Sequence, residues 1–244
     1  MRRTNTNKSL NDGVKALVTG PSGIGKTSLA RTTGDLPRTV VISAEAGTKS
    51  LADEDIDVWE VSSVADMTEA YKLLSDPNSE DSRKYDWVII DSLSEIGEFT
   101  LAEEKLKNAD GRQYWQNYAT TTTGIVKAFR DLKGKNVIFT AKLSKIQDDT
   151  GRIMYGPDMP GKVGNRLTYL FDLAMHMDLV DLGAGKGFHR ALICQPDGSH
   201  EAKSRHKLNM YEKPDLGLLL QKINGTLTTE AAPAAAEQEV QEAQ

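Results

Sequence analysis

The 244-residue sequence lacks most features of secreted, disulfide-stapled and membrane-spanning proteins. Cys194 is the only cysteine, which excludes an intrachain disulfide and a zinc site made of four cysteines. No apolar run approaches the ~18 residues that a membrane span needs. Residues 1–11 are polar and have no apolar centre, unlike a secretory signal. These absences predict a cytoplasmic protein with no membrane partner.

The charge balance excludes a surface that is basic throughout, because the formal net charge is −5. Nucleic-acid binding is still open, since it requires a local basic stripe and not a basic total. The length is enough for one α/β domain with a substantial core. We expect a flexible arm at residues 1–13, one domain at 14–225 and a disordered tail at 226–244, which contains glutamate but no lysine or arginine.

Short apolar segments alternate with helical patterns along most of the chain. This alternation predicts an α/β fold, a mostly parallel central sheet flanked by helices. Residues 171–181 and 188–195 predict a hairpin, and therefore antiparallel strands at one edge. Residues 144–165, which are polar and rich in Gly and Pro, are expected to form a long loop. Other strands are expected at 15–19, 39–43, 57–61, 85–91 and 136–141, and helices at 64–74, 95–108, 114–132 and 214–223.

A glycine-rich segment lies between the first expected strand and a helix expected to run to about Thr33. It reads G-x-x-x-x-G-K-T, the P-loop pattern that binds nucleoside triphosphates. Backbone N–H groups of such a loop surround the phosphates, Lys26 reaches the β- and γ-phosphates, and Thr27 binds Mg²⁺. The sequence therefore predicts ATP and Mg²⁺ as cofactors. The expected nucleotide-binding residues are Gly20, Pro21, Ser22, Gly23, Ile24, Gly25, Lys26, Thr27 and Ser28.

Two acidic residues complete the expected site. Asp91 ends an apolar strand, where it would face the P-loop, and we expect it to hold Mg²⁺ through water. The alternative is that Asp91 caps the following helix, a role that Ser92 and Ser94 also fit. Hydrolysis needs a base that orients water. Glu45, just past the second strand, is preferred, with Glu95 as the alternative base and a plain surface acid as the remaining interpretation.

These residues resemble the core of the RecA/Rad recombinases. In that family the catalytic glutamate follows the second strand and the metal-site strand ends in Asp-Ser, matched here by Glu45 and Asp91–Ser92. The chain looks most like small phage proteins that keep only the RecA-like ATPase core. The resemblance covers about residues 13–223. It implies a RecA-like fold, DNA-stimulated ATP hydrolysis in the host cytoplasm, and a homo-oligomer with ATP at the subunit interface.

The resemblance also gives roles to two features of the later sequence. RecA-like rings and filaments use a basic pair to reach the neighbouring subunit's γ-phosphate, where a cation stabilises developing charge. Lys203 and Arg205 match that pair; the alternative is a solvated basic edge shared with Arg190 and Lys207. The family has a polar residue that links ATP to DNA at the end of the strand before its second DNA loop. Lys142 lies at that place in this sequence. The predicted catalytic residues are Lys26, Glu45, Lys203 and Arg205.

Two segments correspond to the family's loops for single-stranded DNA. Cations bind phosphates and aromatic faces stack on bases, which suits strand binding without sequence preference. The earlier segment is 105–118, where the alternative for Trp115 and Tyr118 is packing in the core. The later segment is the long loop at 144–165, and its alternative is an ordinary surface loop. The DNA-binding candidates are Lys105, Lys107, Arg112 and Tyr114 in the earlier segment, and Lys145, Arg152, Tyr155, Lys162 and Arg166 in the later one.

The resulting hypothesis is a Mg²⁺-dependent ATPase that binds single-stranded DNA and promotes phage-type annealing or homologous recombination. The tail could recruit a single-strand-binding or other replication protein, or only aid solubility. One alternative is a DnaB-like ring helicase or loader, and another is a nucleotide-binding switch that acts through protein partners without DNA. The four histidines, His176, His189, His200 and His206, show no metal-ligand spacing, so no second metal site is predicted.

Overall fold

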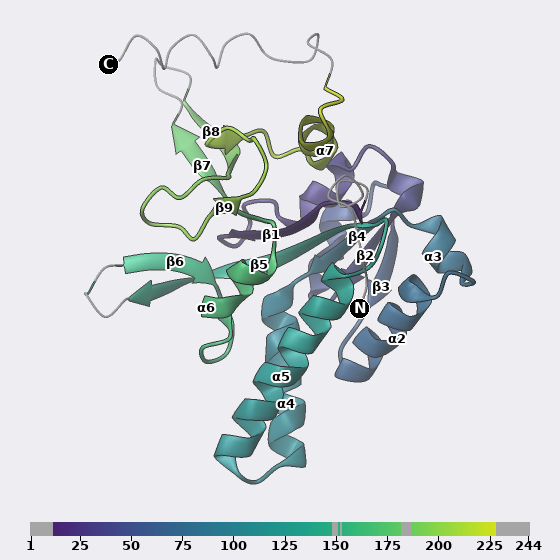
Figure 1. The fold of residues 1–244 in the computed structure, drawn as a ribbon, viewed down its shortest axis with the longest axis vertical. Helices are drawn as coiled ribbons and strands as arrows, with labels where there is room; N and C mark the ends of the chain where they lie inside the picture. The colour runs from purple at the N-terminus through teal and green to yellow at the C-terminus, as the bar shows by residue number, and fades with distance from the viewer. Residues whose placement is uncertain (1–11, 148–150, 152, 182–186, 228–244) are drawn as a thin grey trace, which may run out of the picture.

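A computed structural model describes residues 12–147, 151, 153–181 and 187–227 (Figure 1). The expected arm and acidic tail lie almost wholly outside these residues. The strands are β1 (Lys15–Gly20), β2 (Thr39–Ser43), β3 (Asp57–Glu60), β4 (Trp87–Asp91), β5 (Asn136–Gln147), β6 (Ile153–Pro157), β7 (Leu173–Asp181), β8 (Phe188–Ile193), β9 (Lys203–Ser204) and β10 (Tyr211–Glu212). The α-helices are α2 (Val64–Ser75), α3 (Glu80–Lys84), α4 (Leu93–Lys107), α5 (Gly111–Arg130), α6 (Gly164–Leu167) and α7 (Leu216–Asn224). The 3₁₀ helices include η2 (Thr27–Thr32), η3 (Leu36–Arg38), η4 (Ala46–Leu51) and η5 (Thr168–Leu170).

The ten strands form one sheet in the order β10-β8-β7-β1-β5-β4-β2-β3, with β6 paired to β5 and β9 to β7. Every pairing from β7 across to β3 is parallel. The pairings of β8, β9 and β10, and that of β6 with β5, are antiparallel. This topology confirms the predicted fold class, including the hairpin of β7 and β8 at one side of the sheet.

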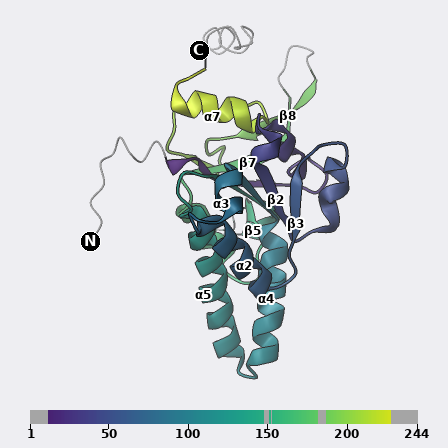
Figure 2. The ribbon, with the colours of Figure 1, turned by 90° about the vertical axis from the view of Figure 1, so that its right-hand side faces the viewer.

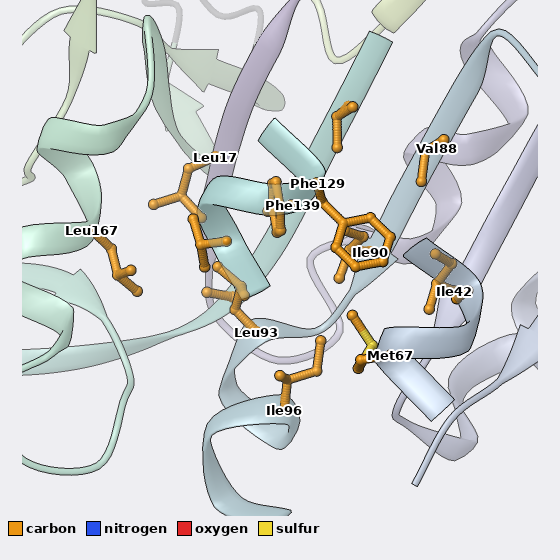
Figure 3. Packing of buried hydrophobic residues seen from close by; sticks show 14 of the residues in the cluster. Leu17, Ile42, Met67, Val88, Ile90, Leu93, Ile96, Phe129, Phe139 and Leu167 are labelled. Carbon is orange, nitrogen blue, oxygen red and sulfur yellow. The ribbon is translucent and has the colours of Figure 1, made fainter. Parts of the chain in front are cut away.

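Helices cover both faces of the sheet. Helices α2, α4 and α5 pack on one face, while α7, η2 and η4 pack on the other (Figures 1 and 2). Within β4, Val88 and Ile90 point into the first core and Trp87 and Ile89 into the second, as the period of two along a strand requires (Figure 3). Each such buried side chain stabilises the fold by roughly 1.5–3 kcal/mol. A slip of one residue would exchange the two sets, so both cores fix the register of β4.

The expectation of a long loop at 144–165 is wrong. Strand β5 continues to Gln147 and pairs with β6, from Leu143 opposite Pro157 to Gln147 opposite Ile153, before the chain enters α6. Figure 1 shows this two-stranded arm extending away from α4 and α5. A projecting arm buries little of either face, so its strands need no apolar alternation and its composition resembles a loop.

Two further expectations need correction. The helix after the P-loop is a short 3₁₀ helix, in which the Thr32 and Thr33 hydroxyls bond back to the carbonyls of Leu29 and Ala30 and so compete with α-helical pairing. The helices expected at 95–108 and 114–132 are confirmed as α4 and α5, so the segment 105–118, matched to a DNA loop of the family, is instead the tip of a helical hairpin. No helix in the described part of the chain is long and apolar enough to cross a bilayer.

Candidate active site

The candidate site lies where three parallel strands end. The carboxyl ends of β1, β2 and β4 meet at one edge of the sheet, because the register pairs Gly20 with Lys142 on β5 and Ser43 with Asp91. The P-loop follows β1, and Glu45 lies two residues beyond the end of β2. This edge is where open α/β sheets bind their ligands.

The P-loop has the backbone that its glycines allow. Gly25 has φ = +107°, a conformation that side chains with a Cβ rarely adopt. A Cβ atom at Gly20 would lie 2.7 Å from the carbonyl oxygen of Met177, so β7 approaches the loop too closely for any other residue. The Lys26 ammonium donates hydrogen bonds to the carbonyls of Gly20 and Pro21, at 2.8 and 2.9 Å. Burial lowers the pKa of Lys26, although Asp91 and Glu45 oppose this shift.

Asp91 joins the P-loop to the centre of the sheet. Its Oδ2 accepts a 2.6 Å hydrogen bond from the Thr27 hydroxyl, and its Oδ1 accepts one from Thr140 on β5. The residue is 2% exposed. Its carboxylate therefore contacts the P-loop and not the start of α4. A hydroxyl and a carboxylate oxygen at this separation are the hard oxygen donors that Mg²⁺ prefers, so the residues present fit this ion.

The two candidate bases are connected by one lysine. Glu45 Oε1 accepts a 2.6 Å hydrogen bond from the Ser92 hydroxyl and lies 3.4 Å from the Lys142 ammonium. Lys142 also forms an ion pair with Glu95. These two carboxylates raise the pKa of Lys142, the hydrogen bond with Glu95 contributing most. A Cβ at Gly47 would lie 3.8 Å from the Thr27 hydroxyl, so the segment that begins at Glu45 passes beside the candidate metal ligand.

The basic pair of the late sequence lies away from this edge. Lys203 donates a 2.8 Å hydrogen bond to the carbonyl of Phe171, and Arg205 forms a 2.6 Å ion pair with Asp172. Strand β9 pairs with the beginning of β7, whereas the P-loop follows the end of β1, which runs parallel to β7. Within one chain, therefore, the structure does not bring Lys203 and Arg205 to the P-loop.

The earlier DNA-binding candidates lie at the tip of the hairpin of α4 and α5. Lys107 is paired with Glu103 and Glu104, and Lys105 lies 6.0 Å from the centre of the Tyr114 ring. Arg112 is exposed, while Tyr114 packs partly against the core. Tyr118 is fully buried, so the core-packing alternative holds for it, whereas Trp115 is 39% exposed.

The later candidates separate into two groups. Lys145 is exposed on β5, Tyr155 stacks on His200, and Arg152 lies outside the described residues. Lys162 and Arg166 instead line an open cavity of about 840 Å³ between α5 and residues 161–166. We call this cavity the α5 groove. Its other lining residues are Trp115, Gln116, Tyr118, Ala119, Thr120, Thr123, Gly124, Lys127, Gly161 and Val163.

Two further residues of the nucleotide site, Thr140 and Arg190, belong to no motif of the sequence. Arg190 lies on β8 opposite Leu179, and a Cβ at Gly25 would lie 3.4 Å from its Nη1. This guanidinium therefore flanks the P-loop on the side away from β4 and Asp91. Nothing in the sequence marks Arg190, because its position depends on the antiparallel register of two late strands.

The fold and the P-loop define a P-loop nucleoside triphosphatase domain. The chain matches the family described as AAA domain over residues 12–206, and it belongs to that family. No curated protein matches the sequence. Among solved structures 137 chains match. One of these is a KaiC-like protein from the hyperthermophilic archaeon Pyrococcus horikoshii OT3, with 15% sequence identity, a TM-score of 0.41, and coverage of 75% of this chain and 79% of that chain.

Proposed function

We propose that the protein binds and hydrolyses ATP with Mg²⁺ and couples this reaction to single-stranded DNA in annealing or recombination. The observation that carries the proposal is the meeting of Lys26, Thr27, Asp91 and Glu45 at one edge of the sheet. Thr27 and Asp91 touch directly, and Glu45 is held beside them by Ser92. These are the phosphate, metal and base functions that phosphoryl transfer to water requires.

Each residue has a distinct task in this proposal. Lys26 exchanges its bonds with the loop carbonyls for bonds with the β- and γ-phosphates. Thr27 and Asp91 would hold Mg²⁺, which would supply positive charge to neutralise the phosphate oxygens. Glu45 accepts a hydrogen bond from the attacking water and orients it toward the γ-phosphorus. Glu95 is the weaker candidate base, because Lys142 interacts more strongly with it than with Glu45, and because Ser92 orients Glu45.

The α5 groove supports the DNA part of the proposal. Lys127, Lys162 and Arg166 line it, and none of their side chains has an ion-pair partner among the residues that the structure describes. Trp115 lies on the same surface, close to Gly161, and remains partly exposed. Unpaired cations beside an exposed indole suit a strand whose phosphates and bases are bound without sequence preference.

Assembly completes the proposed mechanism. Lys203 and Arg205 lie far from the P-loop of their own chain, so a role at the γ-phosphate requires a neighbouring subunit. We propose a homo-oligomer with ATP at the interface, in which these cations make hydrolysis depend on assembly. We further propose that the acidic C-terminal sequence recruits a single-strand-binding or other replication protein.

The first experiment measures Mg²⁺-dependent ATP turnover with and without single-stranded DNA for the wild type, Glu45→Gln and Glu95→Gln. We expect Glu45→Gln to lower kcat by at least ~100-fold while ATP still binds, because removing a positioned base typically costs roughly 10²–10⁴-fold. Glu95→Gln is the matched control and should stay within a few-fold of the wild type. The reverse result would assign the base to Glu95.

The comparison of turnover with and without single-stranded DNA separates the remaining possibilities. Stimulation of turnover by single-stranded DNA, without unwinding of a duplex, supports the recombination proposal. Turnover that is indifferent to DNA, yet lost in Glu45→Gln, would leave the ATPase and favour a switch that acts through protein partners. Duplex unwinding would instead favour a ring helicase.

A further inference from the structure

Two histidines and an aspartate from distant parts of the sequence meet beside β1. His176 and Asp178 point to the same face of β7, and His200 comes from the segment that leads to β9. One ligand atom from each lies within 4.8 Å of the others. His176 Nε2 and Asp178 Oδ2 are 3.4 Å apart, close to the spacing of about 3.3 Å between two ligands of a tetrahedral zinc ion.

Both imidazoles use the other ring nitrogen for a protein contact. Nδ1 of His200 lies 2.6 Å from Asp197 Oδ2, and Asp197 Oδ1 accepts hydrogen bonds from the backbone N–H groups of Ser199 and His200. Nδ1 of His176 lies 3.4 Å from the Thr19 hydroxyl. A carboxylate on the far nitrogen is the usual second partner of a metal-binding histidine. Both Nε2 atoms therefore remain for a common ligand.

We propose that His176, Asp178 and His200 form a binding site for a divalent transition-metal ion of the zinc type, separate from the Mg²⁺ of the nucleotide. Two neutral imidazoles and a carboxylate suit zinc and its neighbours in the first transition row, whereas Mg²⁺ prefers oxygen ligands only. The Asp178 side chain is 40% exposed, which gives the ion a route from solvent and leaves a position for water.

Metal binding would change the packing of the two rings. In this structure the imidazoles of His176 and His200 are stacked, with centroids 3.8 Å apart and planes 12° from parallel. The ring-nitrogen lone pairs of stacked imidazoles lie in nearly parallel planes, so one ring must tilt before both Nε2 atoms can reach one ion. His176 is fully buried in β7, so the change falls to His200, and the contacts of this ring with Tyr155 and Asp197 must adjust with it. Burial and the neighbouring ring lower the pKa of His176.

The site is placed to stiffen the strand that carries the P-loop. Thr19 pairs with His176 in the sheet and directly precedes Gly20. An ion on His176, Asp178 and His200 would tie β7 to the segment around His200 and so hold the surroundings of β1. The metal site does not require that the P-loop hydrolyse ATP, and its test uses no nucleotide.

The experiment titrates the full-length protein, stripped with a chelator, with Zn²⁺ in an isothermal calorimeter. We expect one tight ion per chain, and with Co²⁺ a visible absorption spectrum of mixed nitrogen and oxygen ligation. Asp178→Asn and His200→Ala should weaken Zn²⁺ binding by at least ~10-fold, because even second-sphere changes cost roughly 10–100-fold at such sites. Asp178→Asn is the decisive variant, since its side chain is partly exposed and the substitution keeps its shape.

Two control variants make the result specific. His189→Ala removes an exposed histidine from the neighbouring strand and should leave Zn²⁺ affinity unchanged. Asp91→Asn removes the proposed Mg²⁺ ligand and should also leave it unchanged, whereas it should weaken binding of Mg²⁺ with ATP. Equal Zn²⁺ affinity in the wild type, Asp178→Asn and His200→Ala, or no binding to the wild type, would overturn the inference. In that case the two rings only pack against each other.

Discussion

The Ser92 hydroxyl donates a 2.6 Å hydrogen bond to the Glu45 carboxylate, and so connects the ends of β4 and β2. Ser92 occupies the N-cap position of α4, yet its side chain makes no capping bond there. The hydroxyl therefore orients the glutamate instead of the helix. Asp91 directly precedes Ser92. These two adjacent residues therefore contact both Thr27, the candidate metal ligand, and Glu45, the candidate base.

Replacing Ser92 with Ala should lower kcat for ATP hydrolysis by about tenfold and leave the Kd for Mg²⁺ with ATP unchanged. A hydrogen bond to a charged group contributes roughly 1.5–3 kcal/mol, and the remaining contact of Glu45 with Lys142 preserves part of the orientation. Steady-state kinetics together with nucleotide binding measure both quantities. Ser75→Ala, at an exposed position in α2, is the control and should change neither. An unchanged kcat in Ser92→Ala would show that Ser92 does not position the base.

Arg190 gives a prediction about nucleotide affinity. Its guanidinium lies beside Gly25 on the flank of the P-loop away from Asp91, and it has no ion-pair partner among the described residues. We expect Arg190→Ala to raise the Kd for ATP by about tenfold, or ~1.4 kcal/mol, because the variant cannot make a charge-assisted hydrogen bond with the phosphates. Fluorescent-nucleotide titration measures this, with Arg83→Ala on α3 as the control. Equal affinity in the two variants would contradict a role for Arg190.

The parts of the site that follow motifs were predictable from the sequence. Thr27 and Asp91 are 64 positions apart, yet a P-loop after one buried strand and an acid at the end of another must share an edge when the strands are parallel. Glu45 likewise follows a buried parallel strand and therefore lies at the same edge. Local patterns and the direction of the strands, both of which the sequence carries, are enough for these three positions.

The remaining features depend on register and long-range packing. Arg190 and the cluster of His176 and His200 are brought into place by antiparallel pairings and by a connecting segment whose path no local pattern fixes. The arm of β5 and β6 is not marked by the sequence, because its apolar residues do not alternate with polar ones and β6 ends in Gly156 and Pro157. Tyr155 was expected to be available for stacking on bases, but its ring stacks on His200.

The α5 groove predicts how DNA binding responds to salt. Lys162→Ala and Arg166→Ala should each weaken binding of single-stranded DNA. Each should also make the slope of log affinity against log salt shallower, by about 0.7 for every phosphate that the variant no longer neutralises. Anisotropy titrations across a salt series measure both effects. Lys213→Ala, near α7 on the opposite face of the sheet, is the matched control and should leave the slope unchanged. A slope that is flat in the wild type would remove the DNA assignment altogether.

Lys15 provides a prediction about stability and pH. Its ammonium donates hydrogen bonds to the carbonyls of Leu132 and Lys135, and burial lowers its pKa from 10.5 to about 8, against the attraction of Asp12 and Asp131. Between pH 8 and 10.5 the unfolded chain binds the proton more strongly than the folded chain does. The cost of the buried charge is therefore fully present below about pH 8, and stability from this group rises as pH increases toward 10.5.

Substitution of Lys15 by Met should remove this pH dependence. The difference in unfolding free energy, Lys15→Met minus wild type, should fall by roughly 2 kcal/mol from about pH 8 to about pH 10, since one pKa unit corresponds to ~1.4 kcal/mol. Urea denaturation at several pH values measures the difference and cancels the titration of other groups that both proteins share. Lys133→Met, next to Leu132 but exposed, is the control and should give a difference that does not change with pH. A constant difference for Lys15→Met would mean that Lys15 keeps an ordinary pKa in the folded protein.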